Sequence, residues 1–292
     1  SYLCKLFWKY IKNMNNFFKR VLSAVVYGGV VIASILVHPA FFGIVFMIIT
    51  ALAVHEFHKL AGSSAKATAY ATGGGVLLFA SNYFYFAHDE IAKWLFLIYV
   101  AVIIAAVIRE LFAKEENPIH NWGYLFGSQL MIALPFSLMN GVLMHNNYLL
   151  LALFVMIWVN DSGAYLIGSS MAKRPQGNHK MFPRVSPAKS WEGLFGGIMF
   201  SLIAGYIFYR VGWTNQLGLT AYPLLDAFIF AVVVSLFGNL GDLIESLVKR
   251  TIGVKDSGKF LPGHGGVLDR FDSLLLATPI VYFLFIYFVL YF

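Results

Sequence analysis

The chain has 292 residues, of which 59% are hydrophobic and only 12% are charged. Soluble globular domains carry about 25% charged residues, so this composition excludes a disordered chain and argues strongly against an ordinary water-soluble domain. Lys and Arg outnumber Asp and Glu by 21 to 14, which gives a net charge of +7. Beside long apolar segments such an excess indicates membrane orientation, and we expect no nucleic-acid partner. The single cysteine, Cys4, excludes an internal disulfide and a cysteine zinc site.

Nine apolar segments are long enough, or nearly so, to cross a bilayer, whose core of roughly 30 Å needs about 20 residues per helix. The predicted fold class is therefore all-α: a polytopic integral membrane protein with about nine transmembrane helices. The His-Pro pair at 38–39 predicts a tight turn between the first two helices. The predicted spans are 21–37, 40–54, 68–87, 91–108, 122–143, 147–168, 193–211, 223–247 and 273–292.

The basic residues predict which side of the membrane each connection faces. If the N-terminus is cytoplasmic, every Lys and Arg except Lys93 and Arg210 falls in or beside a cytoplasmic stretch. Cytoplasmic loops of membrane proteins are enriched in Lys and Arg. We therefore expect the N-terminus inside and the C-terminus outside.

The chain is expected to have three parts. The first carries basic residues and apolar residues at helical spacing, which predicts an amphipathic helix on the membrane surface; a disordered leader before a start at Met14 is the alternative. Intramembrane charge is concentrated in the last part, where we expect the chemistry. The parts are the amphipathic segment 1–20, the N-terminal transmembrane helices 21–146, and a catalytic transmembrane region 147–292 with cytoplasmic loops 171–192 and 249–272.

Charged residues cluster near the end of the span at 223–247. Asp242, Glu245 and Lys249 are spaced i, i+3 and i+7, so they lie on one helical face. A carboxylate inside a span costs about 2.5–3.5 kcal/mol to insert, which favours a functional role. The functional interpretation is a metal site with Lys249 binding an anion; an internal ion pair that joins helices is the alternative.

The loop that follows combines both charge signs with glycine. Between Lys255 and Asp272 it contains three Lys or Arg, three Asp, one His and four Gly. Backbone N–H groups and cations can hold phosphate there, while carboxylates hold Mg²⁺. A solvated connection between helices is the alternative.

Other polar positions have two open interpretations each. Asp161 interrupts an apolar span and could ligate metal or bond to a neighbouring helix. Lys189 and Glu192 precede a span, where a helix N-terminus favours anions beside the basic anchor of the loop. His55, Glu56 and His58 predict an interfacial polar cap, with a metal pair as the alternative.

The segment from Ser246 to Asp272 resembles the signature of the CDP-diacylglycerol synthases, also called phosphatidate cytidylyltransferases. That pattern is Ser, two residues, Lys-Arg, four residues, Lys-Asp, then Pro-x-His-Gly-Gly, two residues and Asp-Arg-x-Asp. The stretch 158–193 is also similar, although Ser190 stands where Thr is commoner and 169–178 fits loosely. The matching residues are Ser246, Lys249, Arg250, Lys255, Asp256, Pro262, His264, Gly265, Gly266, Asp269, Arg270 and Asp272.

This resemblance implies that CTP and phosphatidate react to give CDP-diacylglycerol and pyrophosphate. It also implies Mg²⁺, with a second cation if the site holds paired metals, and a homodimer among membrane lipids. We expect the protein in the bacterial inner (plasma) membrane, with its active site facing the cytoplasm.

The resemblance also assigns residues to roles. It assigns the role of metal ligand to Asp242 and Asp269. Asp272 and Asp161 are further candidates for this role. The expected catalytic residues are Lys249, Arg250, Asp256, His264 and Arg270. The expected substrate-binding residues are Ser186, Lys189, Glu192, Ser246, Lys255, Gly265 and Gly266.

Three alternatives compete with this function. A transporter would place its carboxylates at mid-bilayer within inverted repeats, which the sequence does not display. Another lipid-directed CTP enzyme, such as a polyprenol or phytol kinase or an archaeal-lipid cytidylyltransferase, differs in substrate, and a kinase releases CDP instead of pyrophosphate. A lipid scaffold without catalysis would not need so many phosphate-binding groups.

Overall fold

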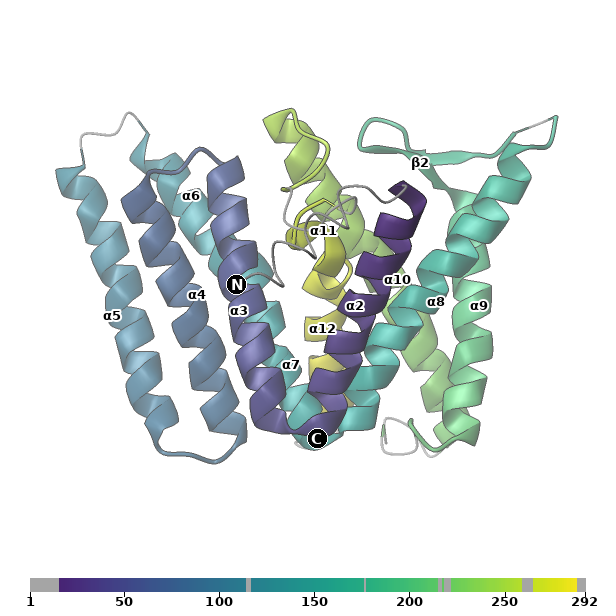
Figure 1. Cartoon of the computed structure of the whole chain (residues 1–292), viewed down its shortest axis with the longest axis horizontal. Helices are drawn as coiled ribbons and strands as arrows, with labels where there is room; N and C mark the ends of the chain where they lie inside the picture. Colours follow the sequence, from purple (N-terminus) through teal and green to yellow (C-terminus); the bar gives the residue numbers. More distant parts are fainter. Residues whose placement is uncertain are drawn as a thin grey trace, which may run out of the picture.

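The computed structural model describes residues 16–113, 117–175, 177–214, 217, 222–258 and 265–287. Within them the chain is helical apart from connections and one β-hairpin (Figure 1). The long helices are α2 (Asn16–Val37), α3 (Pro39–Leu60), α4 (Ala65–Phe86), α5 (Ile91–Phe112), α8 (Asn147–Ala172), α9 (Trp191–Arg210) and α10 (Pro223–Ile252). The shorter elements are α6 (Pro118–Ser128), η1 (Gln129–Ala133), α7 (Leu134–His145), β1 (Lys180–Phe182), β2 (Ser186–Ser190), α11 (Leu268–Phe271), α12 (Leu274–Tyr282) and η2 (Phe283–Tyr287).

The helical membrane fold is confirmed in its main features. Each predicted span coincides with helix in the described part of the chain, and the span predicted at 122–143 is the continuous run α6, η1 and α7. Six helical stretches are long and apolar enough to cross a bilayer; α2 and the pair α12 and η2 give shorter apolar helices. The count of nine spans and the cytoplasmic N-terminus stay predictions. Most of the predicted amphipathic segment 1–20 lies outside the described residues, which begin at Asn16.

Local sequence signals explain where the helices begin and bend. Pro39 starts α3 directly after His38, whose ring nitrogen accepts the N–H of Ala40 at 3.1 Å, and this makes the predicted tight turn. Ser190 caps α9 through the N–H of Gly193 at 3.1 Å. The π-helix η1 comes just before Pro135, which has no N–H to donate to the preceding turn.

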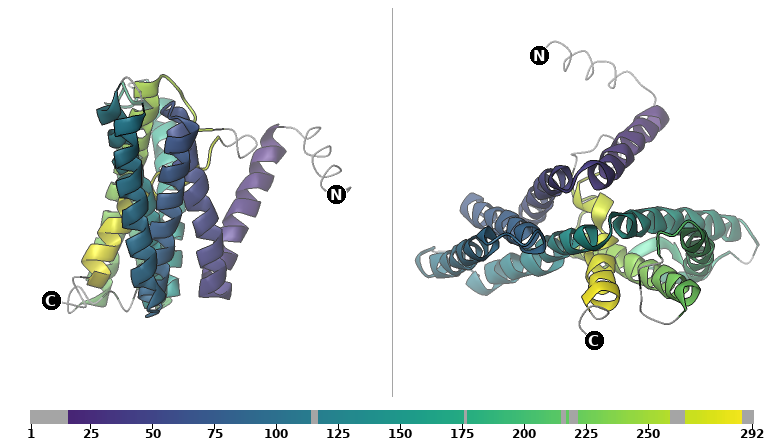
Figure 2. Two further views of the ribbon diagram at one scale, coloured as in Figure 1. Left: turned by 90° about the vertical axis from the view of Figure 1, so that its left-hand side faces the viewer. Right: turned by 90° about the horizontal axis from the view of Figure 1, so that it is seen from below.

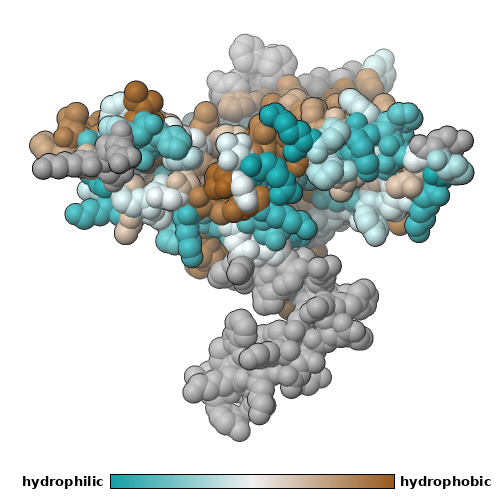
Figure 3. All heavy atoms as spheres, turned by 90° about the horizontal axis from the view of Figure 1, so that it is seen from above, coloured by the Kyte–Doolittle hydropathy of each residue, from teal (hydrophilic) through white to brown (hydrophobic). Residues whose placement is uncertain are grey.

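The helices are arranged so that the polar connections gather at one end. The hairpin and the end of α10 lie at the upper end of the molecule, and α11 lies below them in its upper half (Figure 1). Hydrophilic side chains spread over this face when it is seen from above (Figure 3). Helix α9 packs between α8 and α10, and α10 packs on α12. Helix α2 contacts α3 and α8 but tilts away from the main bundle (Figure 2).

An aromatic cluster supports α11 from below. The ring of Phe271 lies 5.4 Å from Tyr27 of α2, 5.8 Å from Phe46 of α3 and 5.6 Å from Phe136 of α7 between centroids. All three pairs have edge-on geometry, which aromatic rings prefer. Phe271 is buried, so it anchors this short helix to three helices of the first half of the chain.

The loop predicted at 171–192 contains a two-stranded antiparallel hairpin. Strand β1 pairs with β2, and Lys180 lies opposite Ser190. Beside the hairpin, the backbone N–H and ring nitrogen of His179 contact the carboxylate of Glu192, the ring at 2.6 Å. The hairpin therefore ends against the first turn of α9 and holds Lys189 near α10.

Candidate active site

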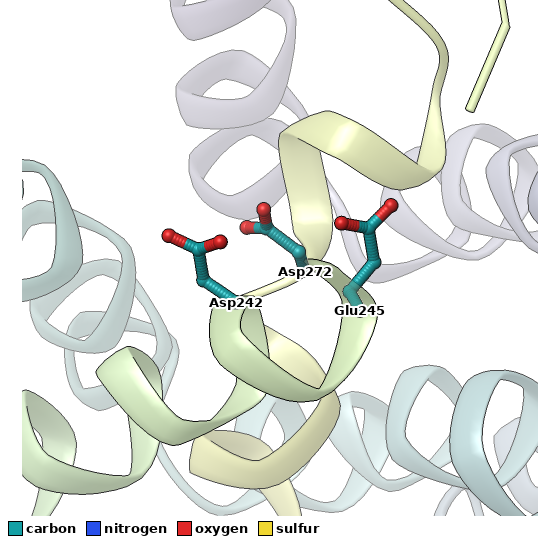
Figure 4. A group of neighbouring side chains, drawn as sticks. All are labelled: Asp242, Glu245 and Asp272. Carbon is teal, nitrogen blue, oxygen red and sulfur yellow. The ribbon is translucent and has the colours of Figure 1, made fainter. Parts of the chain in front are cut away.

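Three carboxylates from two segments meet beside the C-terminal half of α10. Oxygens of Asp242, Glu245 and Asp272 all lie within 4.8 Å of one another. Asp242 and Glu245 are a helical turn apart on α10, and Asp272 comes from the turn before α12 (Figure 4). Gly241 allows this approach, because a Cβ there would lie 2.6 Å from the carbonyl oxygen of Asp272.

Lys249 links this cluster to Asp269. Its Nζ lies 2.6 Å from a carboxylate oxygen of Glu245 and 2.6 Å from one of Asp269. All three side chains are at least nine-tenths buried, so water cannot solvate the two carboxylates. The ammonium of Lys249 neutralises their charge instead. The predicted helical face of Asp242, Glu245 and Lys249 is confirmed, and Lys249 pairs with carboxylates in this arrangement.

Asp269 also organises the glycine-rich loop. Its second carboxylate oxygen accepts the backbone N–H groups of Ser257 at 2.9 Å and Gly266 at 2.7 Å. Burial acts to raise the pKa of Asp269, but the hydrogen bonds from Lys249 and Gly266 outweigh it and hold the pKa below its usual range. Gly265 turns the chain at φ +84°, a conformation that suits glycine.

The hairpin brings a second lysine to the acids. Lys189 Nζ lies 2.8 Å from Asp242 and donates to the carbonyl oxygen of Asn239 at 3.2 Å. Ser246 donates to the other oxygen of Asp242 at 3.2 Å. Asp242 is thus oriented from both the hairpin and the next turn of α10, and the predicted substrate-binding roles of Lys189 and Ser246 stay predictions.

The acids outnumber the bases around this cluster. Asp272 is removed from water and lies near Asp242 and Glu245, and both effects raise its pKa well above its usual range. The carboxylates are Asp161, Asp242, Glu245, Asp269 and Asp272, and the facing cations are Lys189, Lys249 and Arg270. A cation with more than one charge would balance this excess.

The donor set fits a metal ion. Carboxylate oxygens are the ligands that hard divalent cations prefer. Among the described residues, Glu245 Oε1 is buried without a hydrogen-bond partner, so one ligand atom is already free of other bonds. Asp242, Glu245 and Asp272 form the group of closest oxygens, whereas Asp269 is held by Lys249 and the loop backbone.

Two cavities open beside the acids, and Asp161 and Asp242 line both of them. The first, of about 460 Å³, lies between α2, α8 and α11. Its wall combines Asp269, Arg270 and Asp272 with small and apolar side chains. The apolar and small residues that line it are Ala24, Gly28, Phe154, Ile157, Trp158 and Leu274.

The second cavity, of about 400 Å³, lies between α8, the hairpin and the start of α9. Lys180 and Lys189 line it, together with Asn178, Tyr165 and Asn239. This wall offers cations, amides and a phenol ring, which are groups suited to phosphates and a base.

Some of the predicted site residues lie elsewhere. Arg250 donates to the backbone oxygens of Val185 and Val254, so it fastens the hairpin to α10. Glu192 contacts His179, and neither cavity includes it or Ser186 among its described lining residues.

Other predicted residues belong to the glycine-rich loop. Lys255 and Asp256 are exposed, whereas Gly265 and Gly266 lie at the carboxylate of Asp269. His264 lies outside the described residues.

Sequence reasoning did not find several groups that line the cavities. Tyr27 and Trp158 are aromatic residues among many in an apolar chain, and Lys180 was interpreted only as part of a basic anchor. Asn160 accepts from Ser235 and donates to Asp161 at 3.3 Å, which joins α8 to α10. A polar pair on two facing spans would have been a signal for Asn160.

Comparison with known proteins gives a consistent result. A family model described as the cytidylyltransferase family matches residues 18–288. A phosphatidate cytidylyltransferase of Bacillus subtilis is 37% identical over 215 residues, which cover 72% of this chain and 74% of that protein. Proteins of the same name from Haemophilus influenzae and Staphylococcus epidermidis are each 44% identical, over 147 and 134 residues, and in each case 47% of the relative is covered.

Proposed function

The chain belongs to the cytidylyltransferase family, as its signature predicted, and we propose that it transfers the cytidylyl group of CTP to phosphatidate. The products are CDP-diacylglycerol and pyrophosphate. The observation that carries this proposal is the carboxylate cluster of Asp242, Glu245 and Asp272, placed where two cavities meet: one is lined by Arg270 and the other by Lys180 and Lys189.

The two cavities suit the two substrates. Phosphatidate binds in the first cavity, where apolar side chains of α2 and α8 face its glycerol and acyl chains and Arg270 faces its phosphate. CTP binds in the second cavity, where Lys180 and Lys189 face its phosphates. The reacting groups then meet beside Asp161 and Asp242, which both cavities share.

The reaction is a displacement at the α-phosphorus of CTP. A phosphate oxygen of phosphatidate forms the new P–O bond, and the bond from the α-phosphorus to the bridging oxygen breaks to release pyrophosphate. The nucleophile is already anionic, so a strong general base is unnecessary and the main obstacle is repulsion between two anions. Lys189 and Arg270 therefore act by positioning and by neutralising charge.

The acids would hold the metal. Asp242, Glu245 and Asp272 offer the closest oxygens, with Asp161 and Asp269 at the same cavity. Mg²⁺ bound there would neutralise phosphate charge and align the reacting groups, and a second cation is compatible with the number of carboxylates. Lys249 keeps Glu245 and Asp269 in place.

The direct test incubates purified protein with CTP labelled in its cytidine, phosphatidate and Mg²⁺. We expect the label to enter the lipid phase in step with pyrophosphate release. Release of CDP with phosphorylation of a lipid alcohol would favour the kinase alternative, and no reaction with phosphatidate would reject the proposal.

The assignment of cavities has its own test. Ala24→Trp would fill the first cavity, so we expect a higher KM for phosphatidate and an unchanged KM for CTP. Ala188→Trp would fill the second cavity, and we expect the reverse. If both variants changed both KM values equally, the assignment of one cavity to each substrate would be wrong.

The location follows from the same arrangement. The protein is an integral membrane protein, and we assign the end that carries the hairpin and the end of α10 to the cytoplasmic side of a bacterial inner membrane because CTP is cytoplasmic. The homodimer implied by the resemblance stays a prediction, which cross-linking in native membranes can test.

A further inference from the structure

Glu56 connects the first half of the chain to the glycine-rich loop. It lies on the last turns of α3, where the sequence predicted a polar cap at the membrane surface. In the structure its carboxylate accepts the backbone N–H of Leu268 at 2.9 Å, across a sequence separation of 212 residues. The contact is partly buried and specific, which an interfacial cap does not require.

The bond is made at the start of α11. The first N–H groups of a helix have no acceptor within the helix, and here Val267 at the N-cap position provides no side-chain bond. Glu56 thus replaces the missing cap from another helix. Because α11 contains Asp269 and leads directly to Asp272, its first turn sets the direction of both acids.

The described ends of the loop also close around this carboxylate. A Cβ at Gly258 would overlap Glu56, whose atoms are the three nearest to that position. A Cβ at Gly266 would overlap Glu56 and the hydroxyl of Ser257. Glycine is required at both places because Glu56 occupies the space that a side chain would need.

Glu56 and Asp269 accept hydrogen bonds from different backbone N–H groups near the start of α11. Asp269 accepts those of Ser257 and Gly266, and Glu56 accepts that of Leu268. Of the two carboxylates, only Asp269 is among the described residues that line the first cavity, so Glu56 acts from behind the loop.

We propose that Glu56 is a positioning residue, which fixes the start of α11 against Gly258 and Gly266 so that Asp269 stays paired with Lys249 and Asp272 stays beside Asp242. Phe271 anchors the same helix from below, and Glu56 fixes its rotation from the side. The inference rests on the proposed function in that these acids bind Mg²⁺. Loss of Glu56 is expected to weaken metal binding before it changes substrate binding.

The first experiment compares the Glu56→Ala variant with the unaltered protein, both purified in detergent. Without substrates, we measure the Mg²⁺ concentration that gives half of the maximal Mg²⁺-induced increase in Tm. The Mg²⁺ concentration that gives half-maximal turnover is measured separately. Removal of a residue that supports metal ligands typically weakens affinity or activity by 10- to 100-fold, so we expect both concentrations to rise by roughly this factor. The KM for CTP at saturating Mg²⁺ should stay unchanged.

Two variants sharpen this result. Glu56→Gln keeps an oxygen that can accept from Leu268 and should restore most of the Mg²⁺ response, whereas Glu56→Asp withdraws the carboxylate and should not. His55→Ala changes an exposed neighbour and should behave like the unaltered chain. If Glu56→Ala cannot be purified in folded form, Glu56→Asp takes its place. An unchanged Mg²⁺ response in Glu56→Asp or Glu56→Ala overturns the proposal.

The second experiment is a double-mutant cycle with Gly258. Gly258→Ala alone should weaken the Mg²⁺ response at least about tenfold, because the new methyl group displaces Glu56. In the Glu56→Ala background the space is free, so Gly258→Ala should add almost nothing. If the double variant lost as much Mg²⁺ response as the two single variants together, the proposal would be contradicted. Because the Tm measurement contains no substrate, it tests Glu56 even if the cytidylyltransferase assay fails.

Discussion

The two halves of the chain contribute to the site in different ways. All of the clustered acids and both lysines that contact them come from α8 onward. Helices α2 to α7 contribute Tyr27, Phe46 and Phe136 beneath α11, and Glu56 at its start. The second half supplies the charged groups, whereas the first half holds them in place and, through α2, lines one side of the first cavity. Substitutions in the two halves should therefore fail in different ways.

The largest expected effect is the loss of a clustered carboxylate. Asp242→Asn and Asp272→Asn should each abolish turnover while the protein still folds, because each removes a negatively charged ligand oxygen. Turnover of purified protein and a folded elution profile provide the measurement. Glu90→Gln, at an exposed position of the first half, is the matched control and should keep full activity. Full activity of either aspartate variant would remove its assignment to the metal.

Metal removal should be as severe but reversible. Treatment with EDTA is expected to stop cytidylyl transfer, and added Mg²⁺ should restore it, because without a metal ion the five carboxylates outnumber the facing cations and their excess negative charge repels phosphate. The assay is pyrophosphate release before and after metal addition. Turnover that persists in EDTA after extensive dialysis would show that the acids have another role.

Lys249→Ala should reduce stability as well as activity. It leaves Glu245 and Asp269 buried without their cation, and breaking a buried ion pair typically costs about 3–5 kcal/mol. Thermal unfolding in detergent measures the change. Lys93→Ala removes an exposed pair with Glu90 in the first half, so its Tm should stay the same. Equal Tm values for the two variants would show that burial of Lys249 has no such consequence.

A smaller effect is expected from the first half of the chain. Tyr27→Phe removes the hydrogen bond from the phenol to the carbonyl oxygen of Arg270 at 3.3 Å, beside a contact with Trp158. Such a bond contributes about 0.5–1.5 kcal/mol, which corresponds to roughly a two- to twelvefold loss in kcat/KM for phosphatidate. Tyr85→Phe, at an exposed site, should change nothing. A loss as large as that of Asp242→Asn would place Tyr27 among the reacting groups.

The sequence predicted the helices and the acids better than it predicted their partners. Apolar length identified the spans, and the insertion cost of charge identified Asp242 and Asp161 before any family was considered. Helical spacing also placed Glu245 beside Asp242, although the family pattern favoured Asp269 as the second ligand. The division into segments 1–20, 21–146 and 147–292 stays a prediction, because boundaries of this kind depend on contacts that a hydropathy pattern does not contain.

The residues that lie elsewhere than the sequence predicted have partners outside their own helical turn. Arg250 was expected at the phosphates, but the hairpin provides backbone oxygens for its guanidinium. Glu192 was expected in the site, but His179 reaches it once the hairpin forms. Glu56 has its partner 212 residues away, a separation at which local patterns carry no information.

That separation has a consequence for biosynthesis. A ribosome that adds about 5–20 residues per second needs roughly 10–40 s to pass from Glu56 to Leu268. During this interval the carboxylate of Glu56 lacks the N–H of Leu268 that it accepts in the complete fold. The nascent chain must keep Glu56 hydrated until its last helices arrive, so a chain truncated before α11 should expose this carboxylate to water.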